Sequence, residues 1–316
     1  MKPKLLIILL FVSVGCFAEH LPANLKTHAD TTPFEIRKNH LELSQYLSKA
    51  CNNESEKVLI FTYWIAKNIR YDLSEMKSNK RNKIAREVLR DRSAVCGGYS
   101  ALMKQFCDNE KILCFIAVGY GKGGFIKNTF RKKELLHAWN IIRVGKEWKC
   151  VDVTWMNDLV NTSDFKKTGK MKWVYMNPKE FSETHLPYDP RWQLLDDPNT
   201  FDEFWKEKEL SIRKYSSLDS LELIRNKPWY EAEMISIKGA FEENKNEEFL
   251  VRDLCLLGLK LTGGSYDSTE CVLGKGIYLE ARKQWTKFEP YKNSKDHEKV
   301  IKTGIWLSDK RIEMGE

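Results

Sequence analysis

The chain has 316 residues, of which 42% are hydrophobic, 30% charged and 12% aromatic. This composition is typical of a globular protein with a sizeable core, and it excludes a disordered tail, a collagen-like repeat and a low-complexity segment. The formal net charge of +8 is spread along the chain, which argues against a dedicated nucleic-acid-binding protein, since such proteins usually carry a dense basic stripe.

The first 18 residues have the features of an export signal. Lys2 and Lys4 give a basic start, and the uncharged stretch Leu5–Ala18 is too short for a membrane-spanning helix but suits a signal-peptide core. We therefore predict a signal peptide at residues 1–18 and a secreted or periplasmic protein. No later stretch is long and apolar enough to predict a transmembrane segment.

A lipid anchor is the alternative at this end of the chain. Gly15-Cys16 resembles the end of a bacterial lipobox, which would make the protein a lipoprotein anchored at Cys16. Ser13 stands where that box prefers a branched apolar residue, so we favour simple cleavage. Removal of Cys16 leaves seven of the eight cysteines. An odd number in an exported protein leaves at least one thiol unpaired or intermolecular.

Helices are predicted early in the mature chain. Residues 19–40 are polar and indicate a lead-in segment, and two helices are predicted across 41–69. Asn53 followed by Glu56 is typical of a helix start. Apolar residues then occur nearly all round the helix from residue 58 onward, which predicts a buried helix.

Cys96 is predicted to lie in the first turn of the next helix. Ser93 is a good N-cap, and apolar residues follow at helical spacing from Tyr99 to Phe106. A helix N-terminus favours a thiolate through its dipole, and its free N–H groups can stabilise an oxyanion. Taken alone, however, Cys96 is more simply explained as a small buried residue.

A strand is predicted at 112–120, followed by a glycine-rich basic loop at 121–133. Gly119 to Gly124 fits the G-x-G-x-x-G pattern, but a dinucleotide site also needs a helix opening there. The segment leads instead into another strand, so we predict a flexible connection and no cofactor. Its lysines and arginines are better explained by a solvated loop than by steering of an acidic substrate.

A hairpin is predicted from strands at 137–144 and 147–154 around Gly145-Lys146, a pair suited to a type II′ turn. In this register Trp139 faces Asp152, and His137 faces Thr154. His137 and Asp152 then lie diagonally on one face, within reach of a hydrogen bond. A slip of one residue would place them on opposite faces.

At this point the sequence resembles the transglutaminase-like superfamily, and within it bacterial relatives of the kyphoscoliosis peptidase. Three blocks carry the resemblance: Val95-Cys96-Gly97-Gly98-Tyr99, His137-Ala138-Trp139-Asn140 and Val151-Asp152-Val153-Thr154-Trp155. Flanking segments are also similar: Trp64 to Asp72 upstream, and Phe181, His185-Leu186-Pro187 and Trp192 to Leu195 downstream. The resemblance covers roughly residues 40–200, in matching order and spacing.

The resemblance implies an α+β, papain-like fold in which a nucleophile helix packs on an antiparallel sheet. It implies Cys96 as nucleophile, His137 as general base and Asp152 as the group that orients the base. The predicted organisation is a signal peptide at 1–18, a transglutaminase-like catalytic domain at 19–200 and a mainly helical C-terminal region at 201–316.

A metal site has little support in the sequence. Neither a C-x-x-C pair nor an H-E-x-x-H motif occurs, and no acidic loop suits calcium. We therefore predict no metal and no cofactor, and a structural role for His185.

The expected function is cysteine-dependent acyl transfer at amide bonds of a protein or peptide substrate, through a thioester at Cys96. A peptidase or amidase is favoured because nothing in the sequence specifies an amine-binding site. A crosslinking transglutaminase and an inactive binding or scaffold protein are the alternatives.

If Cys96 stays a free thiol, six mature cysteines remain that could form up to three bridges, although Cys107 and Cys114 could equally be buried and free.

Overall fold

The computed structural model describes residues 20–76, 83–122, 136–205, 227–244 and 268–285, with shorter pieces at 221, 224, 254–255, 257–258, 261, 301–306 and 308–310. The predicted signal peptide with Cys16, and residues 123–133 of the basic loop, lie outside the described residues. Among the described helices, none combines the length and hydropathy needed to cross a membrane.

An antiparallel five-stranded sheet lies at the centre of the fold, in the order β6-β5-β4-β3-β7. Its strands are β3 (Cys114–Gly121), β4 (Leu136–Val144), β5 (Glu147–Val151), β6 (Val174–Met176) and β7 (His185–Pro187). Successive side chains of a strand point to opposite faces. Ile141 and Ile142 accordingly belong to two different apolar clusters, one on each face.

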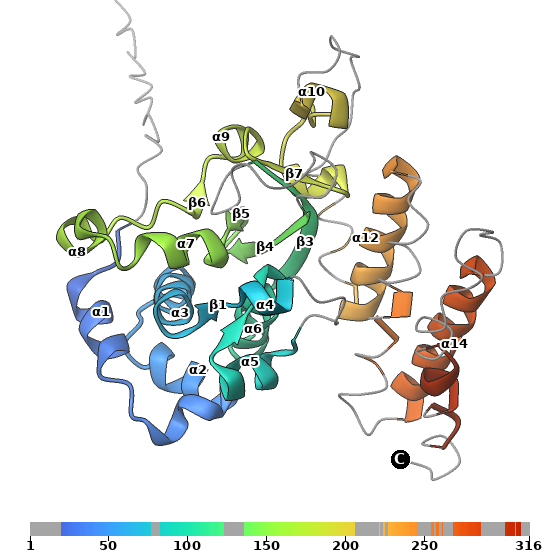
Figure 1. Ribbon diagram of the computed structural model, residues 1–316, viewed down its shortest axis with the longest axis horizontal. Coiled ribbons are helices and arrows are strands. Elements are labelled where there is room, and N and C mark those ends of the chain that lie inside the picture. The colour runs from blue at the N-terminus through green and yellow to red at the C-terminus, as the bar shows by residue number, and fades with distance from the viewer. Residues whose placement is uncertain are drawn as a thin grey trace, which may run out of the picture.

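The N-terminal elements cover one face of the sheet (Figure 1). They are α1 (Ala23–Asp30), η1 (Glu35–Lys38), α2 (His40–Ser48), α3 (Glu54–Asn68), β1 (Arg70–Tyr71), α4 (Leu73–Met76), α5 (Ala85–Asp91), β2 (Ser93–Ala94) and α6 (Cys96–Asn109). The two helices predicted across 41–69 are confirmed as α2 and α3. Asn53 caps α3 by accepting a hydrogen bond from the Glu56 N–H at 2.9 Å, and Phe61 and Trp64 are fully buried.

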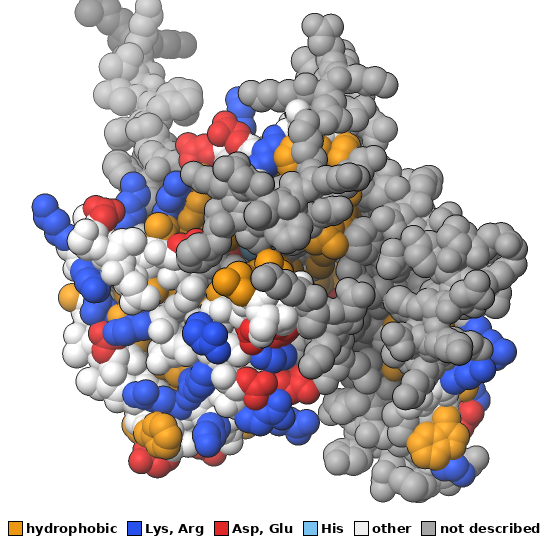
Figure 2. Space-filling view, viewed as in Figure 1, with side chains coloured by type: hydrophobic (Ala, Val, Ile, Leu, Met, Phe, Trp, Pro, Cys, Tyr) orange, Lys and Arg blue, Asp and Glu red, His pale blue; other side chains and the backbone are white. Residues whose placement is uncertain are grey.

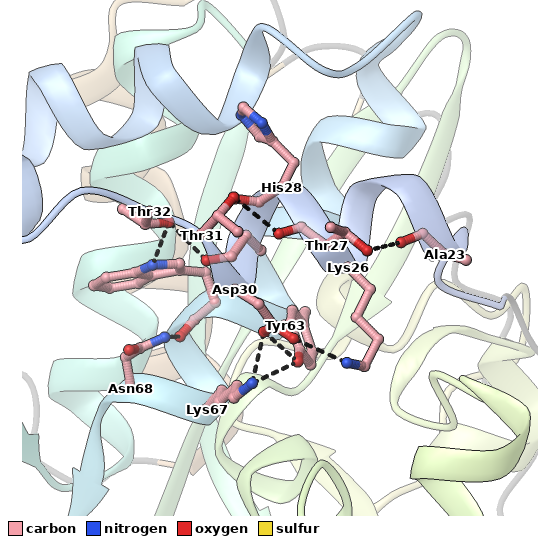
Figure 3. Close-up of polar contacts among 12 residues, drawn as sticks. Ala23, Lys26, Thr27, His28, Asp30, Thr31, Thr32, Tyr63, Lys67 and Asn68 are labelled. Carbon is pink, nitrogen blue, oxygen red and sulfur yellow. Dashed lines mark hydrogen bonds and ion pairs between the residues drawn. The ribbon is translucent and has the colours of Figure 1, made fainter.

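Residues 20–40 are more than a lead-in segment, because they fold back onto α3 through α1. Tyr63 and Lys67 of α3 donate hydrogen bonds to the Asp30 carboxylate at 2.7 and 2.6 Å (Figure 3). The Trp64 indole N–H donates to the Thr32 hydroxyl at 3.1 Å. The polar residues that suggested a lead-in segment thus satisfy hydrogen-bond donors on an otherwise apolar helix, while Leu25 is buried in the core.

The elements after the hairpin complete the fold. They are α7 (Val153–Leu159), α8 (Ser163–Thr168), α9 (Pro178–Ser182), η4 (Pro190–Gln193), α10 (Phe201–Trp205), α12 (Trp229–Asn244) and α14 (Ser268–Trp285). α12 is joined to η4: Trp192 donates to the Ser236 hydroxyl at 2.7 Å, and Arg191 donates to the Ile235 carbonyl at 2.8 Å. The α+β fold is confirmed, and the described residues after 200 are mainly helical, while the domain boundary at 200 stays a prediction.

The surface carries both signs of charge. Figure 2 shows Lys and Arg side chains beside Asp and Glu side chains over the described part of one face. Ion pairs account for some of this mixture, as between Lys83 and Glu75 at 2.9 Å and between Lys57 and Glu110 at 2.6 Å.

Candidate active site

Cys96 is the first residue of α6 and directly follows β2 and Val95. Val95 is extended, and within the described part of the chain no side chain caps the helix or competes for the N–H groups of its first turn. The prediction of Ser93 as N-cap is wrong. Ser93 pairs with Arg70 in the short parallel sheet, and its hydroxyl donates to Asp72 at 3.0 Å.

Cys96 differs in its surroundings from four other thiols. Cys107, Cys114 and Cys150 are buried free cysteines, so the bridges considered from the sequence do not form at these positions. Cys51 is partly exposed, as Cys96 is, but burial raises the pKa of the Cys51 thiol to about 12. Of these five thiols, Cys96 alone combines partial exposure with a place at a helix start.

The predicted hairpin register is confirmed over five pairs, from Val144 opposite Glu147 to Asn140 opposite Val151. Gly145 has a φ of +60°, as the first position of a type II′ turn requires, and glycine adopts it without steric strain. A Cβ at this position would meet nothing within 4 Å, so the backbone conformation alone explains the glycine.

The predicted pairing fails beyond Val151. Trp139 does not face Asp152 and His137 does not face Thr154, because β5 ends at Val151. Asp152 instead turns out of the sheet as the N-cap of α7. A carboxylate at an N-cap satisfies helix N–H groups that would otherwise lack partners, and this local preference ends the strand.

His137 and Asp152 nevertheless meet. The His137 Nε2 lies 2.8 Å from Asp152 Oδ2. The other carboxylate oxygen, Oδ1, accepts the Trp155 N–H at 3.0 Å, and the Asp152 N–H donates to the Trp173 carbonyl at 2.9 Å. The carboxylate is therefore held at both oxygens, and the predicted contact forms through a helix cap rather than through a strand pair.

The pKa values of His137 and Asp152 are both strongly shifted from their ordinary values. Burial by itself lowers the pKa of His137, but the charge of Asp152 and its hydrogen bond outweigh burial, and Cys96 adds to the rise, so that the pKa reaches about 10. Burial raises the pKa of Asp152, yet the charge and hydrogen bond of His137 hold it well below its usual range. The pair is thus an imidazolium and a carboxylate at neutral pH.

Cys96 lies close enough to His137 to act on the pKa of the imidazole. Cys96 acts on the pKa of His137 through a side-chain contact and through its charge. Because Nε2 already contacts Asp152, Nδ1 is the nitrogen that remains for the thiol. The fold therefore brings the three predicted residues into one neighbourhood from the start of α6, from β4 and from the start of α7.

His185 is a fourth member of this site that the predicted triad omits. Its Nε2 lies 3.1 Å from the same oxygen, Asp152 Oδ2. The ligand atoms of His137, Asp152 and His185 all lie within 4.8 Å of one another, a grouping that could hold a metal ion. Both Nε2–Oδ2 distances are hydrogen-bond lengths. The only sequence signal for His185 was its place in the family-like segment after the hairpin.

Aromatic rings enclose the His185 imidazole and the carboxylate beside it. Phe181 stacks on His185 with ring centroids 3.8 Å apart, and Trp155 lies at 4.3 Å. Trp139 meets the same ring edge-on at 5.0 Å. Asp152 has no exposed surface. This shell keeps water from the carboxylate, which strengthens its interactions with the two histidines.

The burial of His185 predicts a loss of stability in acid. Burial lowers the pKa of His185 from 6.5 to about 4. The stability that the neutral side chain contributes is therefore fully present above pH 6.5, and it is lost as the pH falls towards 4. The upper limit of that loss is about 3 kcal/mol. Urea unfolding of the protein and of a His185→Gln variant, at pH 4 to 7, should show a weaker acid loss in the variant, because glutamine does not titrate. Equal pH dependence in both proteins would contradict a buried neutral His185.

Comparisons with known proteins show what this chain is similar to. Residues 41–153, which include Cys96, His137 and Asp152, match the family model of the transglutaminase-like superfamily. The chain is 29% identical over 183 residues to the kyphoscoliosis peptidase of Mus musculus, covering 57% of this chain and 28% of that protein. It is 30% identical over 167 residues to the kyphoscoliosis peptidase of Homo sapiens, covering 52% and 25%.

The chain thus spans about a quarter of the length of these curated relatives. A solved structure from Cytophaga hutchinsonii, described as a candidate cysteine protease, is 20% identical with a TM-score of 0.31, covering 48% of this chain and 47% of that one. The family match and the two curated relatives confirm the resemblance predicted from the three sequence blocks.

Proposed function

We propose that this chain, which carries a transglutaminase-like domain at residues 41–153, is a cysteine-dependent acyl-transfer enzyme that hydrolyses amide bonds of a protein or peptide. The observation that carries the proposal is the buried His137–Asp152 pair, 2.8 Å apart, whose imidazole also interacts with Cys96. A nucleophile, a base and a group that orients the base are the parts that acyl transfer requires.

In the proposed reaction the Cys96 thiolate attacks the amide carbonyl carbon. His137 passes its Nδ1 proton to the leaving nitrogen as the C–N bond breaks, and the acyl group stays on sulfur as a thioester. His137, now neutral, takes a proton from water, whose oxygen bonds to the acyl carbon. The C–S bond then breaks, which releases the acid and restores the thiolate and the imidazolium.

Two features of the site support this sequence of steps. The raised pKa of His137, about 10, keeps its proton in place at neutral pH, where the leaving nitrogen needs it. The N–H groups at the start of α6 donate to no capping side chain among the described residues, so they are suited to hold the oxyanion of the tetrahedral intermediate.

We also propose that the protein acts after export, because residues 1–18 combine a basic start with an uncharged stretch of signal-peptide length. The enzyme would then work in a secreted or periplasmic setting. Anchoring through a lipid at Cys16 remains the alternative form of the same proposal.

The experiment that tests the reaction supplies unfolded protein substrates together with a fluorescent primary amine. We expect new peptide ends from the purified protein, no incorporation of the amine, and neither product from a Cys96→Ala variant. Cys51→Ala is the matched control, because it removes a partly exposed thiol outside the site, and it should behave as the unchanged protein.

Each other outcome identifies a different function. Incorporation of the amine in place of hydrolysis would assign a crosslinking transglutaminase. Neither product from a well-folded protein, together with slow labelling of Cys96 by thiol reagents, would replace the enzyme with a binding or scaffold protein.

A further inference from the structure

The carboxylate of Asp152 accepts more hydrogen bonds than orienting His137 requires. Oδ1 accepts the Trp155 N–H at 3.0 Å, and Oδ2 lies 2.8 Å from His137 Nε2 and 3.1 Å from His185 Nε2. A cap and a single histidine would already give each oxygen a partner. The second imidazole on Oδ2 therefore calls for a separate explanation.

His185 is placed to act as a neutral donor. An ionised carboxylate can only accept hydrogen bonds, so the proton of a neutral His185 lies on Nε2, facing Asp152. Its Nδ1 then accepts from the Thr184 hydroxyl, 2.9 Å away. The same hydroxyl lies 3.2 Å from the Phe181 carbonyl, so the shorter contact is the one to the imidazole. Burial lowers the pKa of His185 to about 4, in agreement with a neutral ring.

The position of the ring is fixed by the sheet and by its neighbours. His185 begins β7 and pairs with Gly121 of β3, the strand that lies next to the strand of His137. Phe181 stacks against the ring with an interplanar angle of 12°. Among the described residues, the titratable groups that act on His185 are Asp152 and His137.

We propose that His185 is a positioning residue: its Nε2–H holds Asp152 Oδ2 against His137 and keeps the buried carboxylate ionised. The inference rests on the proposed function, because it assigns a role in supporting the Cys96–His137 pair. A buried carboxylate is stable as an anion only when several donors face it. His185, which lies 33 positions after Asp152 in the chain, supplies one of those donors.

The test compares two replacements of His185. Phenylalanine keeps an aromatic ring in the stack with Phe181 but removes the donor, whereas glutamine keeps an N–H donor near the position of Nε2. For each protein, the rate of Cys96 alkylation by iodoacetamide is measured from pH 4 to 9, together with kcat and KM for the amide substrate.

We expect His185→Phe to slow alkylation at pH 7 by about 10- to 100-fold, the usual effect of one hydrogen bond to a charged group. In the plot of alkylation rate against pH, the fall in rate at low pH, the acid limb, should occur at a higher pH for this variant. The reason is that the hydrogen bond from His185 lowers the pKa of Asp152, so its removal raises that pKa. The loss should fall on kcat rather than KM. The His185→Gln variant should have the alkylation rate of the unchanged protein, and the same fall in rate at low pH.

Equal behaviour of the phenylalanine and glutamine variants, with unshifted acid limbs, would overturn the inference. If His185→Phe does not fold, Thr184→Val replaces it, since this change removes the hydroxyl that fixes the His185 tautomer and leaves the ring in place. Thr184→Val should shift the acid limb in the same direction by a smaller amount, and an unchanged profile would equally overturn the inference.

A His137→Ala variant separates this inference from the proposed function. If His137→Ala slows alkylation and His185→Phe does not, only the role of His185 fails. If neither change affects the rate, the activated thiol itself, and with it the proposed function, fails.

Discussion

Replacement of Asp152 by asparagine should lower amide turnover by about a thousandfold at pH 7. Burial alone lowers the pKa of His137, whereas the charge and hydrogen bond of Asp152, with a further contribution from Cys96, raise it to about 10. Loss of that charge lowers the pKa of His137, so the proposed mechanism loses part of the driving force that keeps a proton on His137 for the leaving nitrogen. The measurement is kcat as a function of pH on the purified variant.

The hydrogen bonds of Asp152 show why asparagine does not substitute well for it. Oδ1 faces the Trp155 N–H, and Oδ2 faces the nitrogens of His137 and His185. An amide group has one acceptor oxygen, so its NH₂ must oppose either the helix N–H or the two imidazoles. Loss of the helix cap would lower stability by about 1 kcal/mol. Loss of the imidazole contacts would favour the wrong His137 tautomer.

The control for this prediction is Asp164→Asn, the same chemical change in the exposed first turn of α8. Its turnover should match that of the unchanged protein. Turnover at the unchanged level in a well-folded Asp152→Asn protein would sink the proposed role of the ion pair.

Replacement of Gly119 by alanine should lower the free energy of unfolding by about 3 kcal/mol or more. A Cβ at Gly119 would lie 2.0 Å from the Leu186 carbonyl oxygen and 2.5 Å from the Pro187 Cα. These are backbone atoms of β7, which no change of rotamer can move aside. The strand β7 would have to separate from β3, and His185 at its start would move with it.

The matched control is Gly276→Ala in α14, where an added Cβ meets nothing within 4 Å. This change should raise stability by about 0.5–1 kcal/mol, since alanine is the better helix former. Urea unfolding of both variants is the measurement. A Gly119→Ala protein as stable as the parent would show that β7 does not need its close contact with β3.

Local patterns were enough to predict several elements of the site. The apolar periodicity indicated a helix with Cys96 in its first turn, and the Gly145-Lys146 pair set a hairpin register that holds from Val144 to Asn140. Such features depend on residues close together in the chain, where backbone preference and side-chain periodicity act directly. The family resemblance then linked Cys96, His137 and Asp152, which lie far apart in the sequence.

Other features depend on contacts that local patterns do not record. Polar residues around Asp30 form a helix because Tyr63 and Lys67 of α3 bind its carboxylate. Ser93 is drawn into a strand because a parallel partner at Arg70 competes with the cap. In each case a partner distant in sequence outweighs the local preference of the residue.

The sequence by itself determined the candidate residues for the proposed chemistry: a thiol at a helix start, an imidazole and a carboxylate in the order of a known family. Only the tertiary structure decided how the carboxylate is held. Asp152 leaves its strand to cap α7, and β7 joins the edge of β3 to bring His185 onto the same oxygen. Strand order is set by packing of the whole chain, so the second histidine on Asp152 becomes visible only in the folded molecule.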